Sequence, residues 1–93
     1  MTRDEAIRTI ERELDSALEQ WPAWPSDPVH AAAVIAEETG ELVQACLDFT
    51  YALPSFYGDS IQKEAAQVGA MAIRMLMHLE QYHPRQSEPA QKP

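Results

Sequence analysis

The chain has 93 residues, of which 15 are acidic and 7 are basic, so its formal net charge is −8 and it has room for one small domain at most. This acidity argues against a nucleic-acid polymer or an anionic membrane surface as partner, because both require a basic footprint on the protein. No apolar run approaches the ~20 residues of a membrane span, the first residues do not resemble a secretory signal, and one cysteine cannot form an internal disulfide, so we expect a cytoplasmic protein.

The first predicted helix begins at a capping box, residues 2–5 (TRDE), in which the Thr hydroxyl and the Glu carboxylate can satisfy backbone amides reciprocally. Apolar side chains then recur on one face of the helix, at Ile7, Ile10, Leu14, Ala17 or Leu18, and Trp21. The opposite face is charged, which is typical of a surface helix that docks one stripe onto a core. Proline disfavours the helical conformation of the residue before it, so Pro22 is expected to end this helix.

The connector that follows, residues 21–28 (WPAWPSDP), is rigid because proline fixes the backbone at several of its positions. Its two tryptophans, Trp21 and Trp24, are candidates for stacking on a nucleotide base. They can also close the end of a helical bundle, and this structural role is the favoured interpretation.

A second helix is predicted from about Pro28, capped by Asp27, to about Ala52, shortly before Pro54. Glu38 lies in the middle of its apolar stripe, because a helix turns ~100° per residue and several apolar side chains fall within about 60° of it. These are Ala31, Val34, Ile35, Leu42, Ala45 and Phe49. A carboxylate in a packed face is costly unless it is paired or binds a metal, so Glu38 is a candidate site residue.

Three further acidic side chains surround that position. Glu41 lies one turn on, at the edge of the apolar stripe, whereas Glu37 and Asp48 lie further out. A solvated acidic ridge explains Glu37 and Asp48 well. It does not explain Glu38, which a solvated face would not place among apolar neighbours.

A third helix is predicted to begin at Asp59 or Ser60 and to fade near residues 83–84, with Glu64 at the centre of its apolar stripe. The stripe consists of Ile61, Val68, Met71, Met75, Leu79 and Tyr82. Gln67 lies at its edge, three positions after Glu64. Packed against each other, the second and third helices would converge several oxygen atoms on one point, which is how metal sites are built in helical bundles.

Residues 1–83 are predicted to form a single all-α domain. Residues 84–93 (PRQSEPAQKP) are polar and rich in proline, and we expect them to be a disordered tail because they cannot bury enough apolar surface to become ordered. A core built from three helices of this size is thin, so oligomerisation is a natural supplement.

The acidic motifs resemble those of the MazG-like all-α nucleoside triphosphate pyrophosphohydrolases, a superfamily that includes the dimeric dUTPases and the dCTP pyrophosphatases. Its pattern is Glu-Glu-x-x-Glu on one helix and Glu-x-x-Asp on the next, and this chain has Glu37-Glu38-x-x-Glu41 followed by Glu64-x-x-Gln67. The resemblance covers residues 27–79. It implies a helical bundle with three main helices per chain and a four-helix core completed by oligomerisation, as a homodimer or a homotetramer.

The resemblance also implies a magnesium site, with manganese as a substitute, whose ligands are Glu38, Glu41, Glu64 and Gln67. The implied reaction is hydrolysis of a nucleoside triphosphate between its α- and β-phosphates, giving a monophosphate and pyrophosphate. Glu37 and Glu38 would be the catalytic residues, with Glu37 orienting the attacking water. Gln67 departs from the family pattern. Its neutral oxygen is expected either to weaken metal binding or to leave Glu37 or Asp48 to replace it as the fourth ligand.

Three cationic side chains are candidates for contacting the phosphates: Arg74 and His78, which lie near Gln67 on the helical wheel, and Lys63, which lies farther round. Cationic residues of this kind are more often solvated or interfacial, and Arg74 is the strongest of the three phosphate candidates. The sequence does not identify the preferred base or sugar.

Two other interpretations remain. The chain can be a catalytically degenerate helical oligomer that keeps the scaffold and acts as a nucleotide-binding, protein-binding or structural module. A di-iron carboxylate bundle ranks below both, because it requires Glu-x-x-His pairs, whereas position 67 is Gln and position 41 is Glu.

Overall fold

The structure, a computed structural model, describes residues 1–51 and 59–85, and these residues form an all-α fold without strands. The helices are α1 (Arg3–Gln20), α2 (Pro28–Tyr51) and α3 (Asp59–Met77), followed by the short 3₁₀ helix η1 (Leu79–Gln81). The all-α prediction is thereby confirmed. The expected helix end at Ala52 and most of the expected disordered tail lie outside the described residues.

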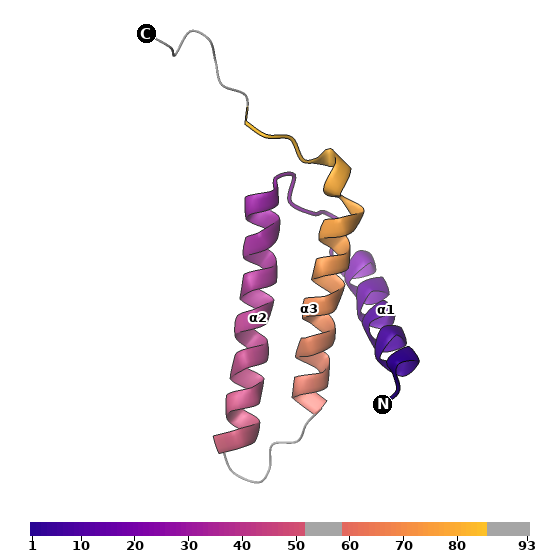
Figure 1. The fold of residues 1–93 in the computed structure, drawn as a ribbon, viewed down its shortest axis with the longest axis vertical. Coiled ribbons are helices and arrows are strands. Elements are labelled where there is room, and N and C mark those ends of the chain that lie inside the picture. Colours follow the sequence, from indigo (N-terminus) through magenta and orange to yellow (C-terminus); the bar gives the residue numbers. More distant parts are fainter. Residues whose placement is uncertain (52–58, 86–93) are drawn as a thin grey trace, which may run out of the picture.

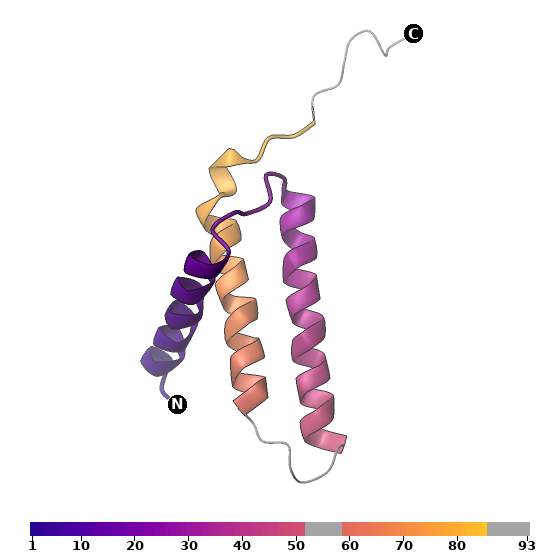
Figure 2. The ribbon, with the colours of Figure 1, turned by 180° about the vertical axis from the view of Figure 1, so that it is seen from behind.

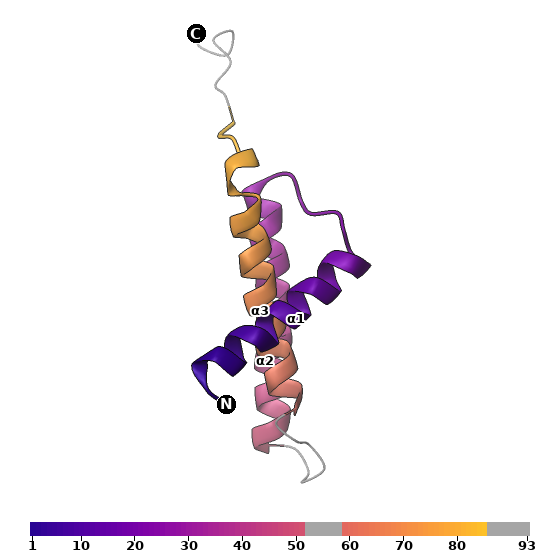
Figure 3. The ribbon, with the colours of Figure 1, turned by 90° about the vertical axis from the view of Figure 1, so that its right-hand side faces the viewer.

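Helix α3 is the central element. It packs against α2 on one side and against α1 on the other, whereas the described parts of α1 and α2 do not pack against each other. Helices α2 and α3 run side by side as an antiparallel hairpin, and α1 crosses α3 obliquely (Figures 1 and 3). The predicted hairpin with an added N-terminal helix is therefore present, and α1 reaches the hairpin only through α3.

The helix starts follow the capping residues of the sequence. The Glu5 amide donates to Thr2 Oγ1 at 3.1 Å, while the Thr2 hydroxyl donates to the Glu5 carboxylate at 3.2 Å. The Glu5 side chain thus accepts from the Thr2 hydroxyl, so only one half of the expected capping box is formed. At the start of α2, the amide of His30 donates to Asp27 Oδ1 at 2.8 Å.

Helix α3 ends earlier than the sequence predicts, at Met77 rather than near residue 83. The amide of His78 lies 3.2 Å from the carbonyl oxygens of both Arg74 and Met75. The His78 ring also donates from Nδ1 to the Arg74 carbonyl at 2.8 Å, which competes with the helical ladder. Backbone hydrogen bonds between residues three apart replace the α-helical bonds between residues four apart. The chain therefore tightens into the 3₁₀ turn of η1.

The core is small and consists mainly of short side chains, which lets the helices approach closely. Its buried apolar residues are Ala17, Ala31, Ala45, Ala66, Ala70 and Met71. Where α1 crosses α3, Ile10 lies directly over Gly69, and a Cβ atom there would be 2.9 Å from Ile10 Cδ1. A side chain at position 69 would therefore require the Ile10 side chain to move, and glycine avoids this at the crossing.

The connector between α1 and α2 passes across the end of α3 (Figure 2). Arg74 of α3 binds it there. Arg74 Nη2 donates to the carbonyl oxygens of Trp21 at 2.6 Å and Ala23 at 3.2 Å. Its guanidinium lies over the Trp24 ring, 4.8 Å from the centroid, and Trp24 Nε1 donates to the Tyr82 hydroxyl at 2.8 Å. Trp24 is therefore part of the packed bundle end, whereas Trp21 is exposed. None of the described helices is long and apolar enough to cross a membrane.

Candidate metal centre

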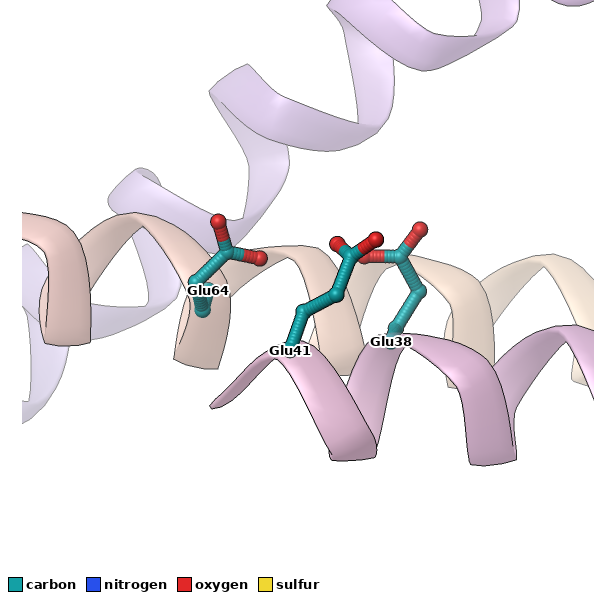
Figure 4. A group of neighbouring side chains, drawn as sticks. All are labelled: Glu38, Glu41 and Glu64. Atoms are coloured by element: carbon teal, nitrogen blue, oxygen red, sulfur yellow. The ribbon is translucent and has the colours of Figure 1, made fainter. Parts of the chain in front are cut away.

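Three carboxylates converge in the groove between α2 and α3. Glu38 and Glu41 come from α2 and Glu64 comes from α3, and one oxygen from each lies within 4.8 Å of the others. Their side chains project toward the same point (Figure 4). Positions three apart share one face of a helix, so a single contact between α2 and α3 brings the three oxygens together. We call these residues the carboxylate group.

The carboxylate group is partly withdrawn from solvent. Glu38 and Glu64 are half-buried, and Glu41 is exposed. Because both half-buried residues sit within the apolar stripes that join α2 to α3, the packing of those stripes holds their carboxylates close to each other. The exposed Glu41 leaves one side of the group open to solvent.

Burial is the largest cause that raises the pKa of Glu38 above its usual value, followed by the charges of Glu41 and Glu64, a hydrogen bond with Glu41 and the charge of Glu37. Burial, the charge of Glu41 and a hydrogen bond with it raise the pKa of Glu64 in the same way, and Lys63 offsets this only in part. The carboxylates therefore repel one another at neutral pH, and a proton or a cation would relieve the repulsion.

The donor set fits a hard divalent cation. Carboxylate oxygens are the ligands that Mg²⁺ and Mn²⁺ prefer, and magnesium is commonly bound by one or two carboxylates while keeping several waters. Neither Glu37 nor Asp48 belongs to the carboxylate group, although both were considered as substitutes for the missing fourth carboxylate. Asp48 instead accepts a hydrogen bond from Gln44 Nε2 at 2.8 Å.

Gln67, the remaining expected ligand, bridges two helices. Its Nε2 donates to Glu13 Oε2 of α1 at 3.1 Å, so the amide nitrogen points to α1 and the amide oxygen is the atom left for a cation. Glu13 also raises the pKa of Glu64 through its charge, as the last of several causes. A fourth carboxylate thus lies near position 67, but α1 supplies it.

Glu13 was missed by the sequence reasoning, although a signal for it exists. On the helical wheel Glu13 falls about 60° from Ile10, at the edge of the stripe with which α1 packs on α3. Glu41 holds the equivalent edge position on α2. The wheel can place such a residue at an edge, but only the crossing of α1 over α3 puts it beside Gln67.

A cleft of about 480 Å³ adjoins the carboxylate group, and Glu38 belongs to both. All three helices and the connector line it: Glu13, Ser16, Ala17 and Gln20 of α1, Trp21, Ala23, Trp24 and Pro25 of the connector, Val34, Glu37 and Glu38 of α2, and Gln67, Met71 and Arg74 of α3. This volume lies within the roughly 300–1,000 Å³ range of small-molecule sites. The cleft therefore offers room for a ligand next to the carboxylates.

The candidate phosphate-binding residues are placed differently from one another. Arg74 lines the cleft at 2% exposure, with its Nη2 bound to the connector and its Nε without a partner; burial lowers its pKa. His78 is stacked on Trp24 and bound to the Arg74 carbonyl, and Lys63 is exposed on α3. Among the described residues that line the cleft, neither His78 nor Lys63 appears.

The two candidate stacking residues both line the cleft, together with Glu37. Trp21 and Glu37 are exposed, whereas Trp24 is half-buried. Trp21 thus has a free ring face at the cleft, while Trp24 uses its ring to contact Arg74 and His78.

The chain matches no protein-family model, no curated protein and no solved structure. The chemistry of the site consequently rests on its own geometry. That geometry combines three converging carboxylates, a cleft that shares Glu38 with them, and a buried guanidinium in the cleft wall.

Proposed function

We propose that this chain is a magnesium-dependent nucleoside triphosphate pyrophosphohydrolase of the MazG-like kind, which converts a nucleoside triphosphate to the monophosphate and pyrophosphate. The proposal rests on one observation: Glu38 belongs to the carboxylate group and also lines the cleft. The spacing of Glu37, Glu38, Glu41 and Glu64 in the sequence supports the same reaction through its resemblance to that superfamily.

Glu38, Glu41 and Glu64, with the amide oxygen of Gln67, would hold Mg²⁺ or Mn²⁺. When bound, the cation supplies charge neutralisation for the phosphates and lowers the pKa of a coordinated water. Glu37 is exposed at the cleft and is not part of the carboxylate group, so it is free to orient a water for attack on the α-phosphorus.

The rest of the cleft would bind the substrate. The buried guanidinium of Arg74 in the cleft wall would attract the phosphates through its positive charge, and the exposed ring of Trp21 can stack on the base, with Trp24 fixing the wall behind it. His78 and Lys63 are weaker phosphate candidates, because neither lines the cleft.

The second candidate function is a binding module that does not turn over its ligand. It is favoured because two of the expected site residues already have partners within the fold. The amide nitrogen of Gln67 is engaged with Glu13, and Nη2 of Arg74 is engaged with the connector. One expected metal ligand and one expected phosphate contact are thus partly used to hold the fold together. The proposal in either form includes a homodimer or homotetramer with a four-helix core, located in the cytoplasm.

The test is pyrophosphate release from a panel of ribo- and deoxynucleoside triphosphates, with Mg²⁺ or Mn²⁺. It compares the native chain with Glu38→Gln, with the exposed matched control Glu11→Gln, and with Gln67→Asp alone and combined with Glu13→Gln. Release by the native chain and Glu11→Gln that is lost in Glu38→Gln supports the enzyme. If the native chain releases no pyrophosphate and a Gln67→Asp variant does, the scaffold is intact and its metal site is disabled.

Thermal melting separates a ligand site from a plain acidic surface. A ligand that binds only the native state raises the melting temperature in proportion to the logarithm of its concentration above its dissociation constant. We expect Mg²⁺ with a triphosphate to raise the melting temperature of the native chain and not that of Glu38→Gln. An equal response of the two proteins contradicts both functions.

A further inference from the structure

Helix α2 has a second apolar face, opposite the one that packs on α3. Six of its residues lie within about 40° of one direction on the helical wheel: Val29, Ala33, Ala36, Gly40, Val43 and Leu47. We call these residues the outer face of α2. Glu38 points about 180° away from their centre, so the carboxylate group and the outer face lie on opposite sides of the helix.

The outer face is uncovered in the described chain. Val29, Val43 and Leu47 are 79%, 52% and 45% exposed, and a Cβ atom added at Gly40 would meet nothing within 4 Å. Among the described helices, α2 packs only against α3, and α1 contacts the hairpin from the far side of α3 (Figures 1 and 3). A helix that is apolar on opposite faces is normally buried on both of them.

The composition of the outer face suits a second helix of the same kind. It carries no charge over the 19 residues from Val29 to Leu47, which span about 27 Å of helix. Its small central residues, Ala36 and Gly40, allow two backbones to approach closely. One face meeting its own copy across a two-fold axis is the usual way in which homodimers form.

Charge favours this face over the groove between α2 and α3. With a net charge of −8 per chain, two copies that met at their carboxylate groups would bring like charges together. Contact through the outer face puts the carboxylate groups on the far sides of both α2 helices. Residues 86–93 (QSEPAQKP) contain no large apolar side chain and are chemically unsuited to cover it.

We propose that the outer face of α2 is the contact between two copies of this chain. The carboxylate groups and their clefts then face away from the interface and stay open to ligands. This arrangement differs from a dimer in which the partner covers Glu38 and Glu64, and it does not depend on any metal or nucleotide.

The experiment measures molar mass by light scattering across a micromolar concentration series. The native chain should have the mass of a dimer or larger. Ala36→Glu and Val43→Glu should raise the dimer dissociation constant at least about tenfold, because each places a charge in an apolar contact. The matched control Leu76→Glu changes an exposed apolar residue of α3 and should leave the mass unchanged. A monomeric native chain, or dissociation by Leu76→Glu alone, overturns the proposal.

Disulfide trapping keeps the test decisive if a glutamate variant fails to fold. In a Cys46→Ser background, Ala36→Cys should form a disulfide-linked dimer on mild oxidation, whereas Leu76→Cys should not. Efficient linkage through Leu76→Cys and none through Ala36→Cys contradicts the assigned face.

Discussion

Glu38 occupies the position in α2 where an apolar side chain would be expected. Its neighbours along the stripe pack onto α3, and its carboxylate meets those of Glu41 and Glu64. Burial and the adjacent charges raise the pKa of Glu38 and of Glu64. Native Glu38 and Glu64 therefore retain protons at pH values where the unfolded chain has lost them.

The first prediction concerns the pH dependence of stability. Because the native pKa values are raised, the contribution of Glu38 and Glu64 is fully present below the usual value of 4.5 and is lost as pH rises through the raised values. Glu38→Gln should thus melt at a higher temperature than the native chain at neutral pH, and the difference should vanish below pH 4.5. Melting curves across this range, with exposed Glu11→Gln as control, check it; a difference that grows toward acid pH contradicts it.

The second prediction concerns the contact between Gln67 and Glu13. Gln67→Glu removes the donor and places two carboxylates together, so it should reduce the free energy of unfolding by about 1–2 kcal/mol. Combining it with Glu13→Gln exchanges the two groups and should restore most of that loss. Urea denaturation of the two single variants and the double variant measures the coupling. Additive effects would mean that the two side chains do not interact in solution.

At the scale of elements, Arg74 ties the connector to α3. It contributes two hydrogen bonds to backbone carbonyls and a cation–π contact to Trp24, all from a side chain that is almost completely buried. A residue expected to bind phosphate is thus also the residue that positions one wall of the cleft.

The third prediction follows from these contacts. Arg74→Met should lower the free energy of unfolding by about 2–3 kcal/mol, because the carbonyls of Trp21 and Ala23 lose a charged donor. Arg74→Lys should also destabilise, since Lys lacks the planar fork of the guanidinium. Chemical denaturation measures both, with the exposed Arg8→Met as control. Full stability combined with loss of ligand binding would instead assign Arg74 to the ligand alone.

The crossing of α1 over α3 depends on the contact between Ile10 and Gly69. The fourth prediction is that Gly69→Leu costs about 1–3 kcal/mol of stability by overpacking this contact. Ile10→Ala in the same chain should recover part of that cost by making space. The matched control Ala72→Leu, at an exposed position of α3, should be close to neutral. Equal effects of Gly69→Leu and Ala72→Leu would show that the helices do not meet at residue 69.

At the scale of the whole molecule, the hydrophobic core of one chain is thin. Most of its buried apolar residues are alanines, and each contributes little apolar area. If two copies bury the outer face of α2 between them, the apolar surface protected from water increases. Folding and association should therefore be linked.

The fifth prediction is that the melting temperature of the native chain rises with protein concentration over the micromolar range, as it does when association stabilises the folded state. Ala36→Glu should remove this dependence, while Leu76→Glu should keep it. Scanning calorimetry at several concentrations provides the measurement. A melting temperature independent of concentration in all three proteins would indicate that the single chain is stable by itself.

The sequence by itself determined the local structure and the central feature of the site. Capping residues and prolines set the start of α2 at Pro28 and the end of α1 at Gln20, because these effects act within one turn. Helical periodicity placed Glu38 and Glu64 among apolar neighbours, and two amphipathic helices joined as a hairpin must bring such stripes together.

Only the tertiary structure decided what lies beside that site. The pairing of Gln67 with Glu13 and the burial of Arg74 under the connector both depend on contacts between residues far apart in the chain. A helical wheel gives the direction of a side chain around its own axis. It does not give the neighbour in that direction, because the crossing angle and register of the helices arise from the packing of all three.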